Sequence, residues 1–214
     1  MIYSSHFTES GPHFDACNYT MALPLTTQIE RMNSIHNMPD KLKLALFNTA
    51  KNRKVHAREV LLKPGEICNH LFFIEEGILS CLEKEGKKTY CTWLMFEGDI
   101  ATAVDSFNNQ VPSTETIEAV TDCIIWTITW QDNEDLTAEF PEYGFIRQKL
   151  TDHYHIQSRQ IDAQRRRRPE QFYAFLLKTF PDIVRVPKKT VASFMGITEQ
   201  TLYDKLKPNK KKVK

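Results

Sequence analysis

The stretch VASFMGITEQTLYDKLK, residues 191–207, decides how the C-terminal part of this 214-residue chain folds. A single glycine, Gly196, separates two short amphipathic runs within it. Glycine has no Cβ, so it adopts with little strain the left-handed conformation in which many helices end. Thr198 follows at a position where a side-chain hydroxyl can cap the first turn of a second helix. The stretch therefore predicts two short helices joined by a tight turn.

The two runs have a regular division into apolar and polar positions. The residues expected to face inward are Val191, Ala192, Met195, Ile197, Leu202 and Leu206. This spacing is that of a helix-turn-helix, in which the second helix enters the major groove of DNA. Polar residues of that helix would read base edges, and nearby lysines would hold phosphates. The predicted DNA-binding residues are Lys188, Lys189, Thr198, Glu199, Gln200, Tyr203, Asp204, Lys205 and Lys207.

The distribution of charge also indicates an anionic partner for this end of the chain. The whole sequence has 28 Lys and Arg residues and 27 Asp and Glu residues, which gives a formal net charge of +1. From Gln164 onward there are 14 basic and 4 acidic residues, a net charge of +10, so the rest of the chain carries −9. An acidic body with a basic end predicts two domains and a polyanionic partner such as double-stranded DNA.

The body of the chain has a helical pattern first and a strand pattern afterwards. Residues 26–50 have helical spacing of apolar residues, and residues 55–130 contain short apolar runs separated by turns. Four glycines punctuate these runs where tight turns or positive φ angles are needed: Gly65, Gly77, Gly86 and Gly98. The pattern predicts a β-barrel or jelly roll within an α+β fold.

Helices are expected again after the strands. Residues 133–140, NEDLTAEF, should form a short helix that begins at an Asn or Asp cap. A long helix is expected over residues 141–167, with Pro141 in its first turn. Its narrow apolar stripe is typical of a two-helix dimer seam, and packing against the strand domain is the alternative. The residues predicted to form the seam are Ile146, Leu150, His153, Gln157 and Ile161.

Four consecutive arginines, residues 165–168, follow the long helix. They fit a solvated helix end, and they equally fit a hinge whose guanidinium groups hold phosphates beside the DNA site. Both interpretations stay open from the sequence.

Several other classes of protein are not indicated. No run of 18 apolar residues exists, and the N-terminus lacks the pattern of a secretory signal. The five cysteines are scattered without a C-x-x-C pair, which favours reduced thiols in a cytoplasm over disulfides or a metal cluster. A cupin-like metal enzyme needs two or three converging histidines, whereas His56 and His70 are fourteen residues apart and no catalytic motif is present. No enzyme activity, metal or cofactor is expected.

The order of strand domain, long helix and helix-turn-helix resembles the Crp–Fnr superfamily of bacterial transcription regulators. The resemblance rests on KPGE (63–66), FFIEEGILSCL (72–82), FEGDIAT (96–102) and VPKKTVASFMGITEQTL (186–202). The last of these looks most like the branch found in Bacteroidetes-type bacteria. The resemblance implies a homodimer joined through the long helix, an effector pocket in the barrel and an inverted-repeat operator. RNA polymerase is a further candidate partner.

The residues with which such regulators hold cyclic AMP are missing. Members that bind it use a Gly-Glu pair and an Arg-Ser/Thr pair, and no Lys or Arg lies between Lys88 and Arg147 here. A buried phosphate would lose charge-assisted hydrogen bonds worth about 1.5–3 kcal/mol each. We therefore expect no tight binding of cyclic AMP and an effector of another kind. The positions expected to line the effector pocket are Thr102, Ala103, Ser113, Thr114 and Thr116.

The recognition helix also departs from the family. Asp204 stands where many relatives have an arginine, and Lys205 replaces an inward apolar residue. A carboxylate in the groove repels phosphate unless it accepts a hydrogen bond from cytosine.

The sequence thus predicts four segments. They are a loose extension over residues 1–25, in which Met21 is an alternative start to Met1; a cyclic-nucleotide-binding-like β-roll domain over 26–140; a dimerisation helix and hinge over 141–168; and a winged-helix-like helix-turn-helix domain with a basic tail over 169–214. The expected function is that of a cytoplasmic, homodimeric, sequence-specific regulator of transcription. The alternatives are a module whose C-terminal helices bind a protein, and a cupin-like enzyme.

Overall fold

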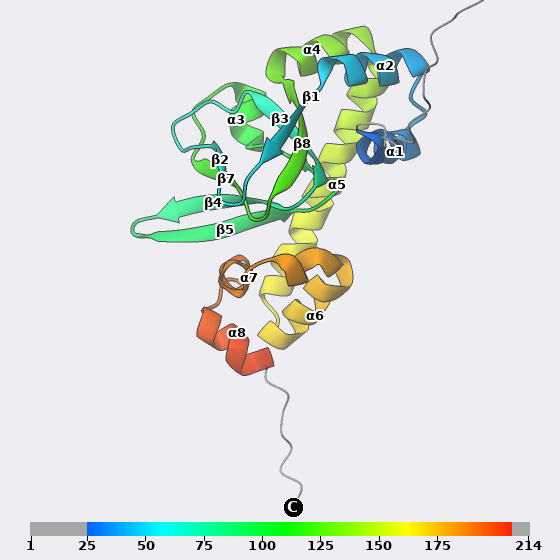
Figure 1. Cartoon of the computed structure of the whole chain (residues 1–214). Helices are drawn as coiled ribbons and strands as arrows, with labels where there is room; N and C mark the ends of the chain where they lie inside the picture. Colours follow the sequence, from blue (N-terminus) through cyan, green and yellow to red (C-terminus); the bar gives the residue numbers. More distant parts are fainter. Residues whose placement is uncertain (1–24, 207–214) are drawn as a thin grey trace, which may run out of the picture.

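The computed structural model describes residues 25–206, and its parts follow one another along the chain. A β-sandwich with flanking helices forms one end, a long helix runs beside it, and a group of short helices forms the other end (Figure 1). The expectations for the N-terminal extension, for Met21 and for Lys207 with the basic tail lie outside the described residues.

The sandwich consists of two four-stranded antiparallel sheets, with the strand orders β1-β8-β3-β6 and β2-β7-β4-β5. The strands are β1 Lys51–Val55, β2 Val60–Leu62, β3 His70–Glu76, β4 Leu79–Glu85, β5 Lys88–Met95, β6 Ile100–Ala101, β7 Glu115–Ala119 and β8 Cys123–Thr129. Two separate sheets confirm the jelly-roll form of the prediction, whereas a single closed barrel is wrong. Side chains such as Phe72, Leu79 and Ile125 fill the space between the sheets.

The helices are α1 Thr26–Ile35, α2 Asp40–Thr49, α3 Val104–Asn109, α4 Trp130–Glu139, α5 Pro141–Arg165, α6 Pro169–Thr179, α7 Lys188–Met195 and α8 Glu199–Leu206, with a 3-10 helix η1 at Pro181–Arg185. Pro141 is in the first turn of α5, as predicted. The start of α4 was predicted wrongly. Its cap is Thr129, which accepts from the backbone N–H of Asp132, while the Asp132 side chain accepts from the backbone N–H of Thr129.

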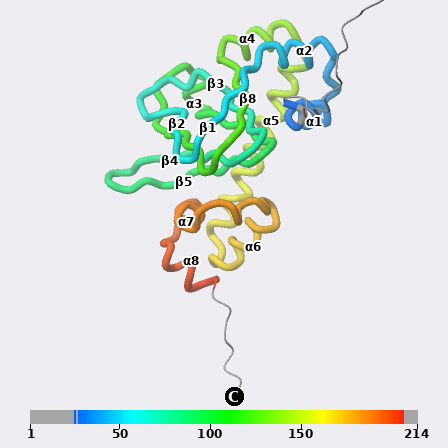
Figure 2. The backbone as a smooth tube through the Cα atoms, viewed as in Figure 1, coloured from blue at the N-terminus to red at the C-terminus, as the bar shows by residue number. Residues whose placement is uncertain are grey.

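The α5 helix runs alongside the sandwich and reaches the C-terminal helices (Figure 2). Ile146 and Leu150 pack with α1, α2 and α4, and Ile161 packs with the C-terminal helices. These three side chains are between 0% and 6% exposed in the single chain, so they are not available for a dimer seam. For Ile146, Leu150 and Ile161 the alternative prediction, packing within the same chain, is the one that the structure supports. His153 is exposed and Gln157 is half-buried, so the seam prediction remains for these two.

Within residues 25–206 the C-terminal unit consists of helices, and no strand follows β8. The hairpin of a winged helix follows the recognition helix, so the predicted wing would fall after α8, in residues 207–214, which lie outside the described residues. The wing therefore stays a prediction.

The four cysteines of the described part are buried free thiols: Cys68, Cys81, Cys91 and Cys123. Their burial agrees with the prediction of mostly buried thiols. None of the helices within residues 25–206 has both the length and the hydropathy to cross a membrane.

Gly77, between β3 and β4, lies where the chain passes close to Asp122 and Cys123. Its φ is +101°, and an added Cβ would lie 2.5 Å from the carbonyl oxygen of Asp122 and 2.6 Å from the Cys123 Sγ. We expect Gly77→Ala to lower the free energy of unfolding by about 2–5 kcal/mol, measured by urea denaturation. Gly86→Ala is the control, because Gly86 also has a positive φ but open space around it, and should cost only about 1 kcal/mol. Equal losses would contradict the steric argument.

Candidate nucleic-acid interface and effector cavity

The turn between α7 and α8 has the predicted geometry. Gly196 ends α7 with a φ of 73°, in the left-handed region. The N–H of Ile197 donates to the carbonyl of Ala192 at 3.0 Å. Thr198 caps α8, because its Oγ1 accepts from the backbone N–H of Thr201 at 3.1 Å. The helix-turn-helix prediction is therefore confirmed at the level of local structure.

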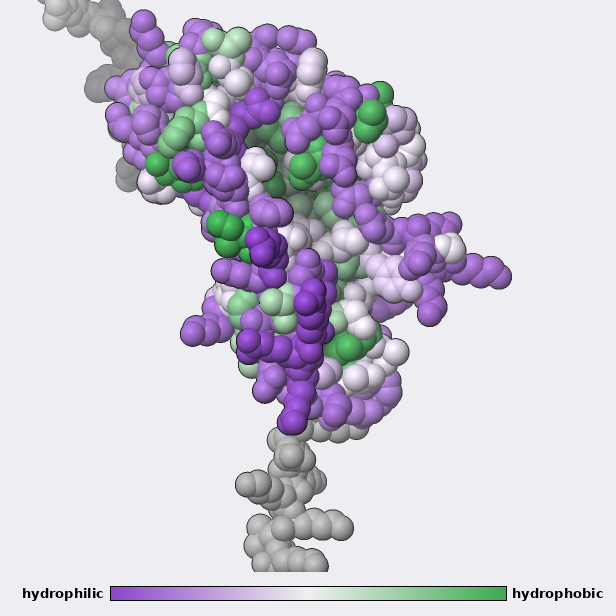
Figure 3. All heavy atoms as spheres, turned by 180° about the vertical axis from the view of Figure 1, so that it is seen from behind, coloured by the Kyte–Doolittle hydropathy of each residue, from purple (hydrophilic) through white to green (hydrophobic). Residues whose placement is uncertain are grey.

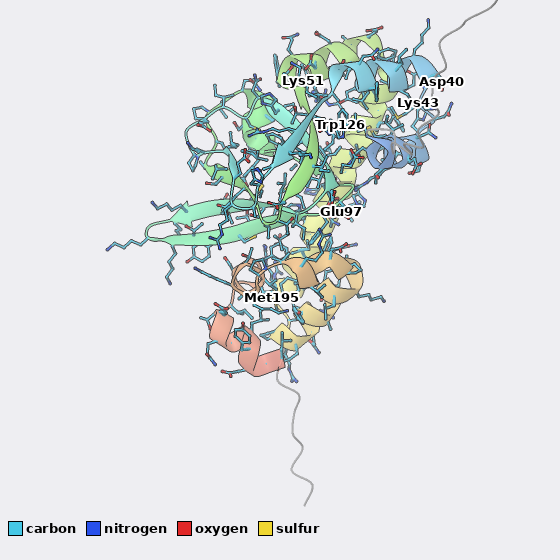
Figure 4. All side chains as sticks on the ribbon, viewed as in Figure 1. Asp40, Lys43, Lys51, Glu97, Trp126 and Met195 are labelled. Carbon is cyan, nitrogen blue, oxygen red and sulfur yellow. The ribbon has the colours of Figure 1, made fainter. Side chains whose placement is uncertain are left out.

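The inner faces of the two helices hold the unit together. Val191, Met195 and Leu202 are buried, together with Phe172 and Leu176 of α6. Figure 4 labels Met195 within this group of helices. Because these residues occupy the inner face, the polar side of α8 is left at the surface.

The outer face of α8 carries the residues predicted to read DNA. Glu199, Gln200, Tyr203 and Asp204 are exposed, and Tyr203 is 50% exposed. Gln200 Nε2 donates to Asp204 Oδ2 at 3.0 Å, one turn along the helix. The carboxylate therefore orients the glutamine amide on this face.

The predicted phosphate-binding lysines differ in their surroundings. Lys188 donates to the hydroxyl of Tyr173 at 2.8 Å, and Lys205 lies 3.5 Å from a carboxylate oxygen of Glu170. Lys189 is exposed at the start of α7, and Arg166, Arg167 and Arg168 are exposed between α5 and α6. Lys188 and Lys205 thus bind α6, whereas Lys189 projects from the surface.

The helix-turn-helix unit contacts the sandwich directly through α7 and β5. The backbone N–H of Cys91 donates to Ser193 Oγ at 2.9 Å. Arg165 donates from Nε to the carbonyl of Phe194 at 3.3 Å and from a terminal nitrogen to the carbonyl of Thr92 at 3.2 Å. Arg165 therefore joins α5, β5 and α7.

A second contact reinforces this junction. Arg185 pairs with Glu97 at 2.7 Å, and Figure 4 places Glu97 where the sandwich meets the C-terminal helices. The pair raises the pKa of Arg185, chiefly through the hydrogen bond from its guanidinium to Glu97. Phe96 stacks on Phe180 beside it, with ring centroids 5.4 Å apart. An apolar contact and an ion pair thus connect the two units.

A cavity of about 830 Å³ lies between the sandwich interior, α3 and α5. Seen from behind, the upper body is hollowed, with hydrophobic residues in its depth (Figure 3). Of the predicted effector-pocket residues, the cavity is lined by Thr102, Ala103, Ser113 and Thr114. Thr116 does not line it, because side chains alternate along β7 and the buried Ile117 and Ala119 take the inner side.

Two cations that sequence reasoning missed also line the cavity. Arg147 and Arg165 come from α5, outside the segment in which a cation was sought. Arg147 pairs with Glu134 at 3.2 Å, and Arg165 pairs with Asp162 at 2.9 Å. Only the spacing of basic residues along the long helix could have hinted at them.

Carboxylates outnumber these arginines in the cavity. Glu83, Asp105 and Glu115 line it and form no ion pair within residues 25–206. Burial raises the pKa of Glu115, and the nearby carboxylates of Glu83 and Asp105 raise it further. The cavity is therefore electronegative where these three residues gather.

The described residues form no metal site. Across residues 25–206, no group of three or more His, Cys, Asp or Glu side chains is placed to hold an ion. His56 is exposed, and its Nδ1 lies 3.8 Å from an oxygen of Asp122.

The sandwich is similar to a known family of domains. Residues 52–140 match the family described as the cyclic nucleotide-binding domain. This match covers the sandwich from β1 to α4. A comparison with curated protein sequences finds no match.

Solved structures share the fold of most of the chain at low identity. FixK2 from Bradyrhizobium japonicum is 12% identical with a TM-score of 0.63, and the alignment covers 73% of this chain and 82% of FixK2. CLP from Xanthomonas campestris, described as a c-di-GMP-responsive global regulator, is 12% identical with a TM-score of 0.61 over 79% of this chain and 90% of CLP. A protein from Eubacterium rectale assigned to the Crp/Fnr family of transcriptional regulators is 13% identical with a TM-score of 0.63 over 79% and 82%. The chain therefore has a Crp-like fold.

The junction at Arg165 leads to a prediction about coupling between the two units. Arg165→Ala removes both hydrogen bonds between α5 and its neighbours and should destabilise the chain by about 1–2 kcal/mol, measured by urea denaturation. Amide hydrogen exchange in α7 should increase at the same time. Arg166→Ala is the control, because Arg166 is exposed, and should change stability by less than about 0.5 kcal/mol. Unchanged exchange in α7 would contradict the role of Arg165.

Proposed function

We propose that this chain is a sequence-specific DNA-binding regulator of transcription of the Crp–Fnr type, active as a homodimer and responsive to a small molecule. The observation that carries the proposal is the exposed polar face of α8, presented by a capped helix-turn-helix. The net charge of +10 from Gln164 onward supports it, because DNA is a polyanion. The order of sandwich, long helix and helix-turn-helix supports it as well.

The proposed reading head is the first half of α8. Gln200 offers an amide that can pair with adenine, and Glu199 and Asp204 can accept from cytosine. Thr198 and Tyr203 add hydroxyls to the same surface. Among the predicted lysines within residues 25–206, Lys189 is the best-placed phosphate contact, since Lys188 and Lys205 would first have to leave their partners on α6.

The proposed dimer uses the exposed face of α5. Ile156 is 56% exposed on this helix, and His153 and Gln157 lie within one turn of it. An apolar residue at this exposure on a long helix fits a helix–helix contact with a second copy. Two reading heads would then meet half-sites roughly 34–36 Å apart on an inverted repeat.

The proposed effector site is the cavity. In this proposal residues 26–140 form the sensing unit, residues 141–168 form the connecting helix and hinge, and residues 169–214 form the DNA-binding unit. Thr92 and Arg165 line the cavity, and Arg165 donates hydrogen bonds to the carbonyl of Thr92 and to the carbonyl of Phe194 in α7. A molecule that binds one arrangement of Thr92 and Arg165 more tightly than another shifts the population of molecules toward that arrangement, and with it the position of the DNA-binding unit. Cyclic AMP is not the proposed effector, because both cavity arginines are already paired with carboxylates.

The test is selection of genomic DNA fragments by the purified protein, followed by affinity measurements over a range of salt concentrations. An enriched inverted repeat, with affinity that falls steeply as salt rises, is expected. Absence of an enriched motif together with salt-insensitive capture of a protein would instead indicate a protein-binding module.

Two substitutions in the reading head should have different effects. Gln200→Ala should reduce discrimination at one base position by about 1–3 kcal/mol, because it removes a base contact. Lys189→Ala should weaken binding to all sequences and reduce the slope of log affinity against log salt by about 2 for the two copies of a dimer. Lys51→Ala is the control, since Lys51 lies in β1, far from the C-terminal helices in Figure 4. Identical effects of all three on a selected fragment would contradict the assignment.

The dimer contact has its own test. Ile156→Glu places a charge in the proposed seam and should convert the dimer to a monomer in sedimentation at micromolar concentration, because burying an unpaired charge is costly. Val184→Glu is the control, since Val184 is 61% exposed on η1 and lies outside the proposed seam. A chain that remains dimeric with Glu at position 156 would place the contact elsewhere.

A further inference from the structure

The arrangement of the carboxylates in the cavity does not stabilise the fold. Glu83 of β4 and Glu115 of β7 stand directly opposite each other in the strand register. Like charges in opposite positions destabilise an antiparallel pair. Asp105, at the first turn of α3, lines the same cavity and adds to the electrostatic repulsion that Glu115 experiences.

The chain does not neutralise this arrangement itself. The cavity lining includes two arginines, but Arg147 pairs with Glu134 and Arg165 with Asp162, as described above. His155 is the remaining basic side chain in the lining. The negative charge of the three carboxylates is therefore left for solvent or for a bound molecule to compensate.

A bare metal ion does not fit the arrangement. No three carboxylate, thiol or imidazole groups of residues 25–206 lie close enough together to coordinate one ion. A larger cation, in which the charge sits on an organic body, can instead approach the carboxylates while its body fills the space.

The remaining lining suits such a body. Trp93 and Leu71 line the cavity as partly buried residues, and Phe107 and Met95 line it from the buried sandwich core. Aromatic faces attract ammonium groups, and apolar side chains take up hydrocarbon. A volume of about 830 Å³ is within the range of small-molecule pockets.

We propose that the cavity binds a small organic ammonium, an amine with an aromatic or aliphatic body, whose charge faces the opposed carboxylates of Glu83 and Glu115, with Asp105 in the same cavity. This proposal rests on the proposed function, in which the cavity is the effector site, and it defines the chemical class of the effector. An anionic cyclic nucleotide would meet three carboxylates with no unpaired arginine opposite it. The preference is therefore for the opposite charge to that of the ligand after which the domain family is named.

The experiment compares matched probes that differ only in charge, using isothermal titration calorimetry on the full-length protein. The amines are 2-phenylethylamine, tryptamine and hexylamine, each tested against the corresponding alcohol and carboxylate. At least one amine should bind about tenfold more tightly than its alcohol, with its carboxylate weaker still. If no amine exceeds its alcohol, or if a carboxylate or cyclic AMP binds more tightly, the proposal is overturned.

Substitution of the facing carboxylates tests the location. In the double variant Glu83→Gln with Glu115→Gln, the preference for the amine should fall below about threefold, since the shape of the pocket is kept and the charge is lost. The melting temperature should be unchanged or higher, because the like-charge pair is removed, and this measurement verifies that the variant folds. Glu85→Gln is the control, because Glu85 lies on β4 two residues beyond Glu83 and does not line the cavity. A retained preference in the double variant would place the amine elsewhere and overturn the proposal.

Failure of this proposal and failure of the proposed function give different results. If the protein selects an inverted repeat but shows no preference for ammonium probes, the regulator remains and the effector class is wrong. If it binds an amine with loss of preference in the double variant but selects no DNA, the cavity assignment stands and the regulatory function is wrong.

Discussion

The α5 helix must pack against both ends of the molecule, and the rest of the structure depends on this constraint. Its first half is buried by α1, α2 and α4 through Ile146 and Leu150, and its last turns are buried by the C-terminal helices through Ile161. Because one rigid helix makes both contacts, the position of the sandwich relative to the helix-turn-helix is set by its side chains. Arg165, at the end of α5, completes the connection through hydrogen bonds to both units.

Local patterns were sufficient to predict much of the fold. Gly196 and Thr198 predicted the turn between α7 and α8, because left-handed backbone and a hydroxyl cap are properties of single residues. The start of α4 was missed, since Asp132 and Asn133 are both good caps and only Thr129 has the backbone geometry to serve. The long helix was predicted from its spacing, but which of its apolar residues were buried inside the chain could not be, because a stripe does not identify what covers it.

The cavity was predictable only in part. Thr102, Ala103, Ser113 and Thr114 come from the segment that resembles the effector region of the Crp–Fnr superfamily, and they do line it. The arginines come from α5 and Glu83 comes from β4, so only tertiary packing between distant parts of the sequence brings these side chains to the cavity. An argument about charge that is restricted to one stretch of sequence therefore misses the groups that decide the electrostatics of a pocket.

The contact between Ser193 and Cys91 has a consequence for the state of the sheet itself. β5 is the edge strand of its sheet, and α7 lies against it and occupies one of its outward backbone N–H groups. Uncovered strand edges are templates for pairing with another chain, and proteins commonly shield them with a helix. The helix-turn-helix unit is thus also the shield of this edge. A movement that lifts α7 from β5 would open a site for strand addition, so the position of the helix-turn-helix and protection from aggregation depend on the same surface.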